Sequence, residues 1–585
     1  MSQRFDAVTV ALTGQLSFIL IVSAFLALVA SYLLLRRYRR AVIRSMLLRS
    51  RSEILQTTGY LPPETEHKPN DAPLGFNFVT RAALPANREA LRLYRRAIRR
   101  QWLTAFVHVI AGCCFAAAMT AAFLTAGKMD FLPFRFMYLT WVNSWPVLIA
   151  VDLVVRLSRR GKLIGAAIYF LIGGILGAIL LAKSPGLPVG QLLYLWLEFN
   201  AMPTVLLLIF LNRRIRAVGP LVLVFMILGV TGASFVVTLT GNNQKLLRAV
   251  SDFSYSIGLG ARGTMVALHL IGFAACAVLG WLVLGLLRRL YEKKFVSESS
   301  INVDAMWLLF GIVNSIGLVF EGRVWILSGL AAFIVYKLVA AGLFRVFGAA
   351  RRAKMQRHRL LFLRVFALGK RSESLYDLLG KSWRTVGSMQ MIAGPDLATS
   401  TVEPHEFLDF VSGKLDRRFI DSGGVLDLRI DQMDLEPDGE GQFRVTEFFC
   451  HDDTWKMTLA RLADESEAVL MDLRGFGENN AGCVFEITEL FNLAALQRVV
   501  FAVDPTTDQE FMRKTMQNAW RRIKDHSPNR RLGGAGQVSL VQLSRTGAGE
   551  MRNLLFAICA AASGLSLREM AQRPIANSDL QEFSW

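Results

Sequence analysis

Long apolar stretches recur along the first 350 positions of the chain. Each has about 20 residues, the length that a helix needs to cross the roughly 30 Å hydrocarbon core of a bilayer. We place nine of them, at residues 16–35, 102–126, 134–156, 163–182, 190–212, 217–240, 263–287, 302–320 and 324–345. The pattern predicts an α-helical polytopic membrane domain over residues 1–350, with a loop at 36–101.

A different pattern begins near residue 358, after a short basic linker at 351–357. Short apolar runs alternate there with amphipathic segments of helical period, which is typical of βαβ units. The runs that we expect to be strands are 360–368, 388–394, 467–473, 498–504 and 537–544, and we expect a hairpin over 424–450. Strands that alternate with helices predict an α/β domain over 358–585 with a doubly wound parallel sheet.

Charge indicates how the apolar stretches are oriented. The chain has 66 Lys and Arg against 46 Asp and Glu, a net charge of +20. The basic residues cluster at 36–40, 88–100, 158–162, 212–216, 288–294 and 351–359, and with nine spans every cluster falls on one side. Because basic loops stay cytoplasmic, we expect a bacterial inner-membrane protein with a periplasmic N-terminus and a cytoplasmic C-terminal domain. The expected partner of these clusters is the lipid bilayer, and no nucleic acid is expected.

Polar residues inside apolar spans are candidate functional residues because they are costly to place in lipid. We single out Asp152, Glu198, Asn200 and Lys337. Glu198 and Asn200 stand close to Pro203, a combination that would frame a small polar site in a disturbed helix. Hydrogen bonding between helices explains such residues equally well, and a helix pair with Arg156 accounts for Asp152.

Polar and glycine residues also follow the expected strands. In a doubly wound sheet a ligand lies beyond the carboxyl ends of the strands. The residues at those ends are Gly369, Lys370, Gly394, Asp396, Asp472, Arg474, Gly475, Asp504 and Arg545. Carboxylate, guanidinium and glycine together suit a nucleotide phosphate or ribose, although loops are polar in any protein. The six cysteines show no CxxC pair and no Cys/His ligand spacing, so neither a metal site nor a disulfide framework is expected.

The stretch GENNAGCVFEITEL, residues 477–490, resembles the helix after the third strand of TIR (Toll/interleukin receptor) domains. That helix typically carries the motif Trp-Cys-x-x-Glu-Leu, and the corresponding residues here are Gly482, Cys483, Glu486 and Ile487. In family members that hydrolyse NAD this glutamate is catalytic, so the resemblance implies a catalytic role for Glu486, where a carboxylate would stabilise a ribosyl cation. NAD or another nucleotide is then the implied ligand. A solvated helix acid beside Glu489 is the plainer interpretation.

These observations together favour an integral inner-membrane protein with a cytoplasmic TIR-like domain that binds a nucleotide or signals, with NAD hydrolysis and stress or defence as the implied activities. Two other interpretations stay open at this point: a transporter or channel regulated by a nucleotide-binding domain, and an interaction scaffold without chemistry. Whether the domain is an enzyme and whether it assembles with further copies of itself are also left open.

Overall fold

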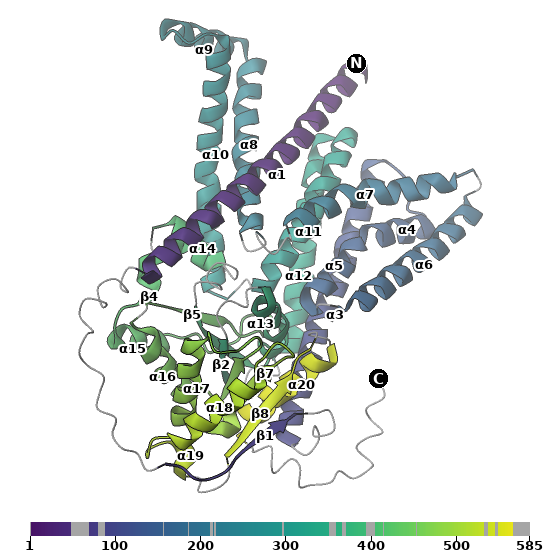
Figure 1. Ribbon diagram of the computed structural model, residues 1–585. Coiled ribbons are helices and arrows are strands. Elements are labelled where there is room, and N and C mark those ends of the chain that lie inside the picture. Colours follow the sequence, from purple (N-terminus) through teal and green to yellow (C-terminus); the bar gives the residue numbers. More distant parts are fainter. Residues whose placement is uncertain are drawn as a thin grey trace. The chain divides into compact units, whose positions relative to one another are not determined.

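The chain is described from a computed structural model, shown in Figure 1. The structure describes residues 2–47, 69–79, 88–155, 157–184, 186–210, 215, 218–294, 298–349, 358–364, 370–393, 404–413, 415–451, 453–531, 536–544 and 548–564. The chain divides into two compact units. The helical unit contains Met1–Tyr38, Ala105–Ala349 and Val402–Leu408, and the α/β unit contains Arg39–Thr104, Ala350–Thr401 and Asp409–Trp585.

Long helices make up the helical unit. They are α1 (Ser2–Leu47), α3 (Arg88–Ala126), α4 (Pro133–Asn143), α5 (Trp145–Val155), α6 (Arg159–Lys183), α7 (Val189–Phe210), α8 (Gly219–Asn242), α9 (Gln244–Ser256), α10 (Ala261–Glu292), α11 (Glu298–Leu318) and α12 (Ser328–Ala349). Within the part of the chain that the structure describes, 9 helical stretches are long and apolar enough to cross a membrane, α4 and α5 counting as one. The predicted number of apolar helices is therefore confirmed.

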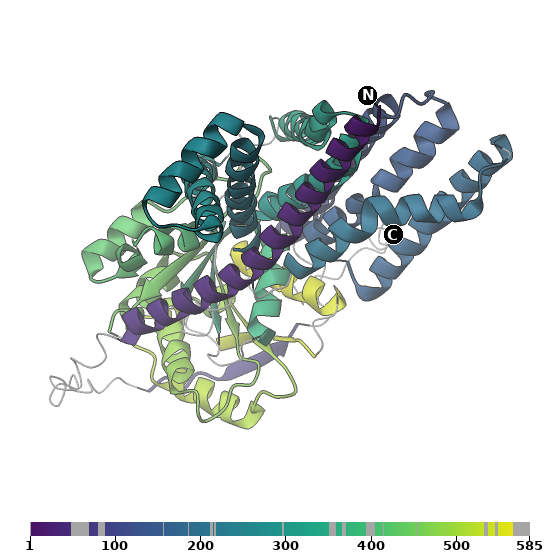
Figure 2. The same ribbon diagram turned by 90° about the horizontal axis from the view of Figure 1, so that it is seen from above.

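Glycines let neighbouring helices of this unit approach closely. Helices α8 and α10 run side by side (Figures 1 and 2), and a Cβ atom on Gly232 or Gly272 would collide with the backbone of the other helix. Gly311 on α11 and Gly329 on α12 meet in the same way, and Oγ of Ser315 accepts a hydrogen bond from the Gly329 N–H at 2.7 Å. Close contacts between glycines of this kind are typical of helices that associate in lipid.

The α/β unit contains a sheet with eight strands among the described residues, and all of its pairs are parallel. Its strands are β1 (Leu74–Phe78), β2 (His358–Arg364), β3 (Gly387–Ala393), β4 (Phe419–Ile420), β5 (Val445–Cys450), β6 (Ala468–Asp472), β7 (Val499–Val503) and β8 (Gly536–Gln542). Their order is β1-β8-β7-β6-β2-β3-β5-β4. All five strands expected in the C-terminal region are present, and each pairs in parallel.

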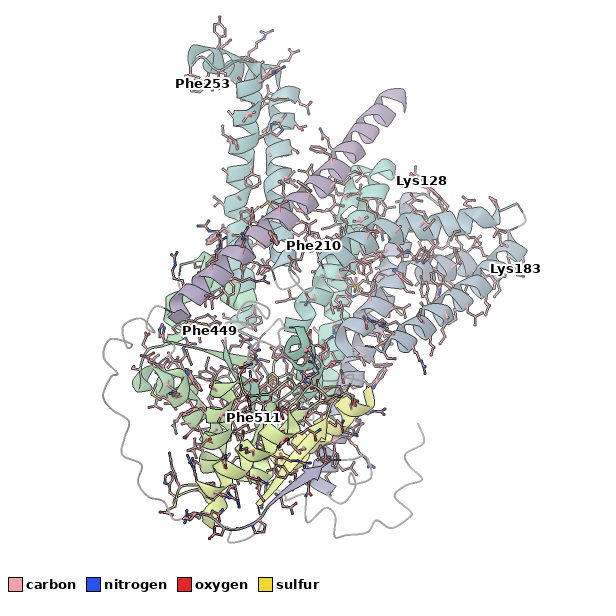
Figure 3. The ribbon with its side chains drawn as sticks, viewed as in Figure 1. Lys128, Lys183, Phe210, Phe253, Phe449 and Phe511 are labelled. Atoms are coloured by element: carbon pink, nitrogen blue, oxygen red, sulfur yellow. The ribbon has the colours of Figure 1, made fainter. Side chains whose placement is uncertain are left out.

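Apolar clusters cover both faces of the sheet. Alternate residues of β2 belong to different clusters: Leu361 packs with helices α16 (Trp455–Glu465), α17 (Ala481–Leu493) and α18 (Gln509–Arg521). Leu360 packs on the other face with α13 (Lys370–Trp383) and α20 (Ala548–Ala562). Strands buried on both sides read as continuous apolar runs, as the sequence of this region does. Figure 3 labels Phe449 of β5 and Phe511 of α18 in this unit.

Two segments differ from the sequence-based expectation. The predicted hairpin at 424–450 is wrong: helix α15 (Gly423–Asp431) occupies its first half, and β5 pairs in parallel with β3. Leu426 and Ile430, four residues apart, are buried, as expected for one face of a helix. Over so short a run, residues with this helical spacing also fit the alternation of a strand. The segment at 36–101 contributes β1 to the sheet, and Arg88–Thr104 of α3 belong to the α/β unit.

Candidate ligand site at the carboxyl edge of the sheet

Two oppositely charged residues end the neighbouring strands β2 and β6. Arg364 is the last residue of β2 and stands opposite Asp472, the last residue of β6, in the strand register. Both are buried, with exposed fractions of 3% and 0%. Asp472 was predicted at a strand end, but the apolar run predicted that β2 continues to residue 368, which would put Arg364 inside the strand.

Asp472 and Arg474 form a buried ion pair with two hydrogen bonds. Nε of Arg474 donates to Oδ1 of Asp472 and Nη2 donates to Oδ2, both at 2.7 Å. The same Nη2 also donates to the backbone C=O of Arg371 at 3.0 Å, at the start of α13. This two-pronged geometry is the strongest that an arginine makes with a carboxylate. The pair therefore holds the turn after β6 against the beginning of α13.

The turn itself requires a glycine. Gly475 has a φ of 68°, in the left-handed region that glycine adopts without strain.

The turn after β6 is hydrogen-bonded to the loop after β7. The hydroxyl of Thr507 donates to the Leu473 C=O at 2.9 Å, and the Asp508 N–H donates to the Phe476 C=O at 2.9 Å. The carboxyl ends of β6 and β7 are thus tied together, as expected for neighbouring strands of a parallel sheet.

Asp504 pairs with Arg371, an exposed cation at this edge. Its carboxylate accepts hydrogen bonds from Arg371 and from both the N–H and the hydroxyl of Thr506, the last two at 3.0 and 2.6 Å. Burial alone raises the pKa of Asp504, but the hydrogen bonds from Thr506 and the positive charges of Arg371 and Arg474 outweigh burial and hold that pKa below its usual range. Arg371 keeps 46% of its side chain exposed. Arg371 was not among the residues predicted from the sequence, although it directly follows Lys370, which was.

Glu486 is buried inside the unit. It lies on α17 with an exposed fraction of 2%, so the interpretation as a solvated helix acid is wrong. Burial raises its pKa from 4.5 to about 8, and the positive charge of Arg364 only partly opposes that effect. Among the described residues, no hydrogen-bond partner reaches its Oε2 atom. A carboxyl group in this state holds a proton at neutral pH, as general acids in apolar surroundings do.

The remaining ligand-binding candidates fall outside what the structure describes. They are Gly369, Gly394, Asp396 and Arg545. Lys370 is described as the first residue of α13, but its side chain is not described. The residues that the structure does bring together are Arg364, Arg371, Asp472, Arg474 and Asp504, with Glu486 on the following helix.

The polar candidates within the helical unit have different surroundings and partners. Asp152 accepts from Nζ of Lys162 at 2.5 Å, Glu198 is exposed, and Asn200 is buried and donates to the Val142 C=O at 3.1 Å. Lys337 pairs with Asp304, an acid that sequence analysis missed because it stands near the start of its span.

Comparison with known proteins adds no relative. No family model, curated protein or solved structure matches the chain.

Proposed function

We propose that the protein is an integral protein of the bacterial inner membrane whose cytoplasmic α/β unit binds a nucleotide and signals its presence. The observation that carries the proposal is the group of charged residues at the carboxyl ends of β2, β6 and β7. An exposed arginine, Arg371, is held there by Asp504 at the beginning of a helix, beside the ion pair of Asp472 and Arg474. Guanidinium groups and helix beginnings are recurrent phosphate partners.

The strand order supports the same location. The strands β8-β7-β6-β2-β3 follow the order of flavodoxin-like doubly wound sheets, which is also the order expected for a TIR-like domain. From β2 the chain turns to β3 on one side, and β6 lies on the other. Ligands of doubly wound sheets bind at this change of direction. Arg364 and Asp472 end the two strands concerned.

Roles can be assigned to individual side chains under this proposal. Arg371 would contact the anionic group of the ligand, since it combines exposure with a fixed position. Asp472 and Arg474 would act as positioning residues, because their charges and hydrogen bonds are already used in pairing with each other inside the unit. Glu486 would be the catalytic residue if the domain hydrolyses NAD. Nicotinamide leaves NAD as a neutral base and needs no proton, so the role of Glu486 would be to stabilise the ribosyl cation as a carboxylate after losing its own proton.

Binding can be tested with the full chain in detergent, because β1 and part of α3 complete the α/β unit and a C-terminal fragment would lack them. We expect a nucleotide or dinucleotide from a panel to raise the melting temperature, as any ligand of the native state does. Arg371→Ala should lower the affinity for this ligand at least about tenfold, which corresponds to a loss of about 1.4 kcal/mol of binding free energy. Arg461→Ala is the matched control, since Arg461 is another half-exposed arginine that pairs with an acid. Equal affinity in both variants would contradict the assigned site.

Catalysis is tested separately by incubating the protein with NAD and measuring nicotinamide. Glu486→Gln should keep binding and reduce turnover by about a hundredfold or more, because it removes a group that acts in the transition state. A chain that binds a nucleotide without turnover would be a sensor, and a chain that binds none would favour the scaffold interpretation.

A further inference from the structure

Helices α3, α11 and α12 of the helical unit bring four polar side chains together within an apolar core. His108 lies on α3, Asp304 on α11, and Tyr336 and Lys337 on α12. Nδ1 of His108 lies 2.7 Å from the hydroxyl oxygen of Tyr336, and Nζ of Lys337 donates to Oδ2 of Asp304 at 2.7 Å. His108 is also close enough to interact electrostatically with Asp304 and Lys337. We call these four residues the charged cluster.

The carboxylate of Asp304 is incompletely satisfied. Its Oδ2 atom faces Lys337, whereas Oδ1 is buried and accepts no hydrogen bond from any residue that the structure describes. The side chains of Asp304 and Lys337 are 17% and 38% exposed, and His108 is 2% exposed. Burying a charged pair is costly, and apolar residues of similar size often stabilise a core as well or better. Helices α11 and α12 already pack closely through Gly311 and Gly329.

The other helices that pack on α11 bring no competing charge to Asp304. On α5, Asp152 pairs with Lys162 and accepts from the Leu157 N–H at 3.0 Å. On α7, Glu198 is exposed. The short helix η2 (Val319–Glu321) ends in Glu321, which is exposed, and η3 (Arg323–Leu327) begins with Arg323, whose side chain is not described. Among the side chains that the structure describes, the charged groups that act on the Asp304 carboxylate are therefore those of the charged cluster.

We propose that Asp304 is an intramembrane proton-binding site, with Lys337 as its counter-ion and the His108–Tyr336 pair as its neighbouring proton relay. A proton from water adds to Oδ1 of Asp304, Lys337 remains an ammonium ion, and the cluster gains one positive charge; the reverse step returns the proton to water. A metal cation would have to displace the ammonium group from Oδ2. A proton needs only the second oxygen, and hydroxyl and imidazole groups both donate and accept. This proposal is independent of the ligand site in the α/β unit.

Infrared difference spectroscopy of the purified full chain during a pH titration measures carboxyl protonation directly. We expect a protonated-carboxyl band that Asp304→Asn removes. Asp152→Asn is the matched control, since Asp152 also pairs with a lysine in the helical unit, and should leave the band unchanged. Lys337→Met should move the titration upward by about 1–3 pH units, the usual effect of losing a nearby opposite charge.

Two results would overturn the proposal. One is a set of spectra in which Asp304→Asn and the unaltered chain titrate alike. The other is purely structural behaviour, in which Asp304→Asn lowers the melting temperature, Asp304→Asn with Lys337→Gln restores it, and no pH-dependent carboxyl band differs between these variants and the unaltered chain. If Asp304→Asn does not fold, the Lys337→Met titration decides alone, because an unchanged midpoint excludes Asp304 as the titrating group.

Discussion

Replacing Glu486 with Gln should stabilise the α/β unit at alkaline pH. The folded chain keeps the proton of Glu486 up to about pH 8, whereas the unfolded chain releases it near 4.5. The contribution of this group to stability is therefore fully present below pH 4.5 and is lost as the pH rises toward 8. Glutamine keeps the shape of the side chain and carries no charge at any pH. The variant should consequently lack this pH dependence.

The magnitude follows from the shift. The whole difference between 4.5 and about 8 corresponds to at most about 5 kcal/mol, at about 1.4 kcal/mol per pH unit. Between about pH 5 and pH 8 the wild-type chain should lose about 3 to 4 kcal/mol that Glu486→Gln retains. Because Glu486 is buried, little of this effect should be screened by solvent. A local opening of α17 should therefore become about 300-fold more frequent in the wild type relative to the variant.

Thiol labelling measures that opening at the right place. Cys483 is buried one turn before Glu486 on α17, so a reagent reaches it only when the helix opens. Labelling rates are compared between wild type and variant at each pH, which cancels the pH dependence of thiol reactivity itself. Cys450 and Cys559, buried elsewhere in the same unit, are internal controls. If the ratio of Cys483 rates stays constant from acid to alkaline pH, the assignment of a raised pKa to Glu486 is wrong.

Three further predictions concern other parts of the chain. Asp472→Asn should lower the stability of the α/β unit by about 3–5 kcal/mol, since it leaves the buried Arg474 without its countercharge. Chemical denaturation measures this loss, and a near-neutral effect would mean that the pair is not buried. Gly232→Val should separate α8 from α10 and lower the melting temperature by the equivalent of about 1–3 kcal/mol or more; full stability would show that the helices do not touch there. In a cysteine-free background, Ser251→Cys should react with a membrane-impermeant thiol reagent on intact cells and Lys68→Cys should not, and the reverse pattern would refute the proposed orientation.

The sequence predicted the elements of this protein well where hydrophobicity alone determines them. Nine apolar helices and five buried parallel strands each leave a long, uniform apolar run. The predicted hairpin was wrong because residues 426–431 alternate apolar and polar side chains, and a short stretch of this kind suits both a strand and a helix. Strand β1 was missed because five residues between turn-rich segments carry little signal without their partner β8.

The candidate site was predictable only in part, for a related reason. Asp472 and Asp504 follow conspicuous apolar runs, so their positions at strand ends could be inferred. Arg364 could not, since apolar residues continue after it and conceal where the strand ends. The burial of Glu486 and the pairing of Asp304 with Lys337 depend on contacts between elements distant in the sequence. No local pattern contains that information.

The pairing of β1 with β8 has a consequence for how often the chain can cross a membrane. Asn77 and Gln537, 460 positions apart, share a hydrogen bond across these strands. Two strands of one sheet must be on the same side of a bilayer, so the number of crossings between them has to be even. Of the 9 candidate spans, the one at Gln15–Met46 precedes β1 and all the others lie between β1 and β8. An even number of candidate spans therefore separates β1 from β8. The hydrogen bonding of the sheet thus requires the same even number that the distribution of basic residues indicates, and it does so without reference to charge.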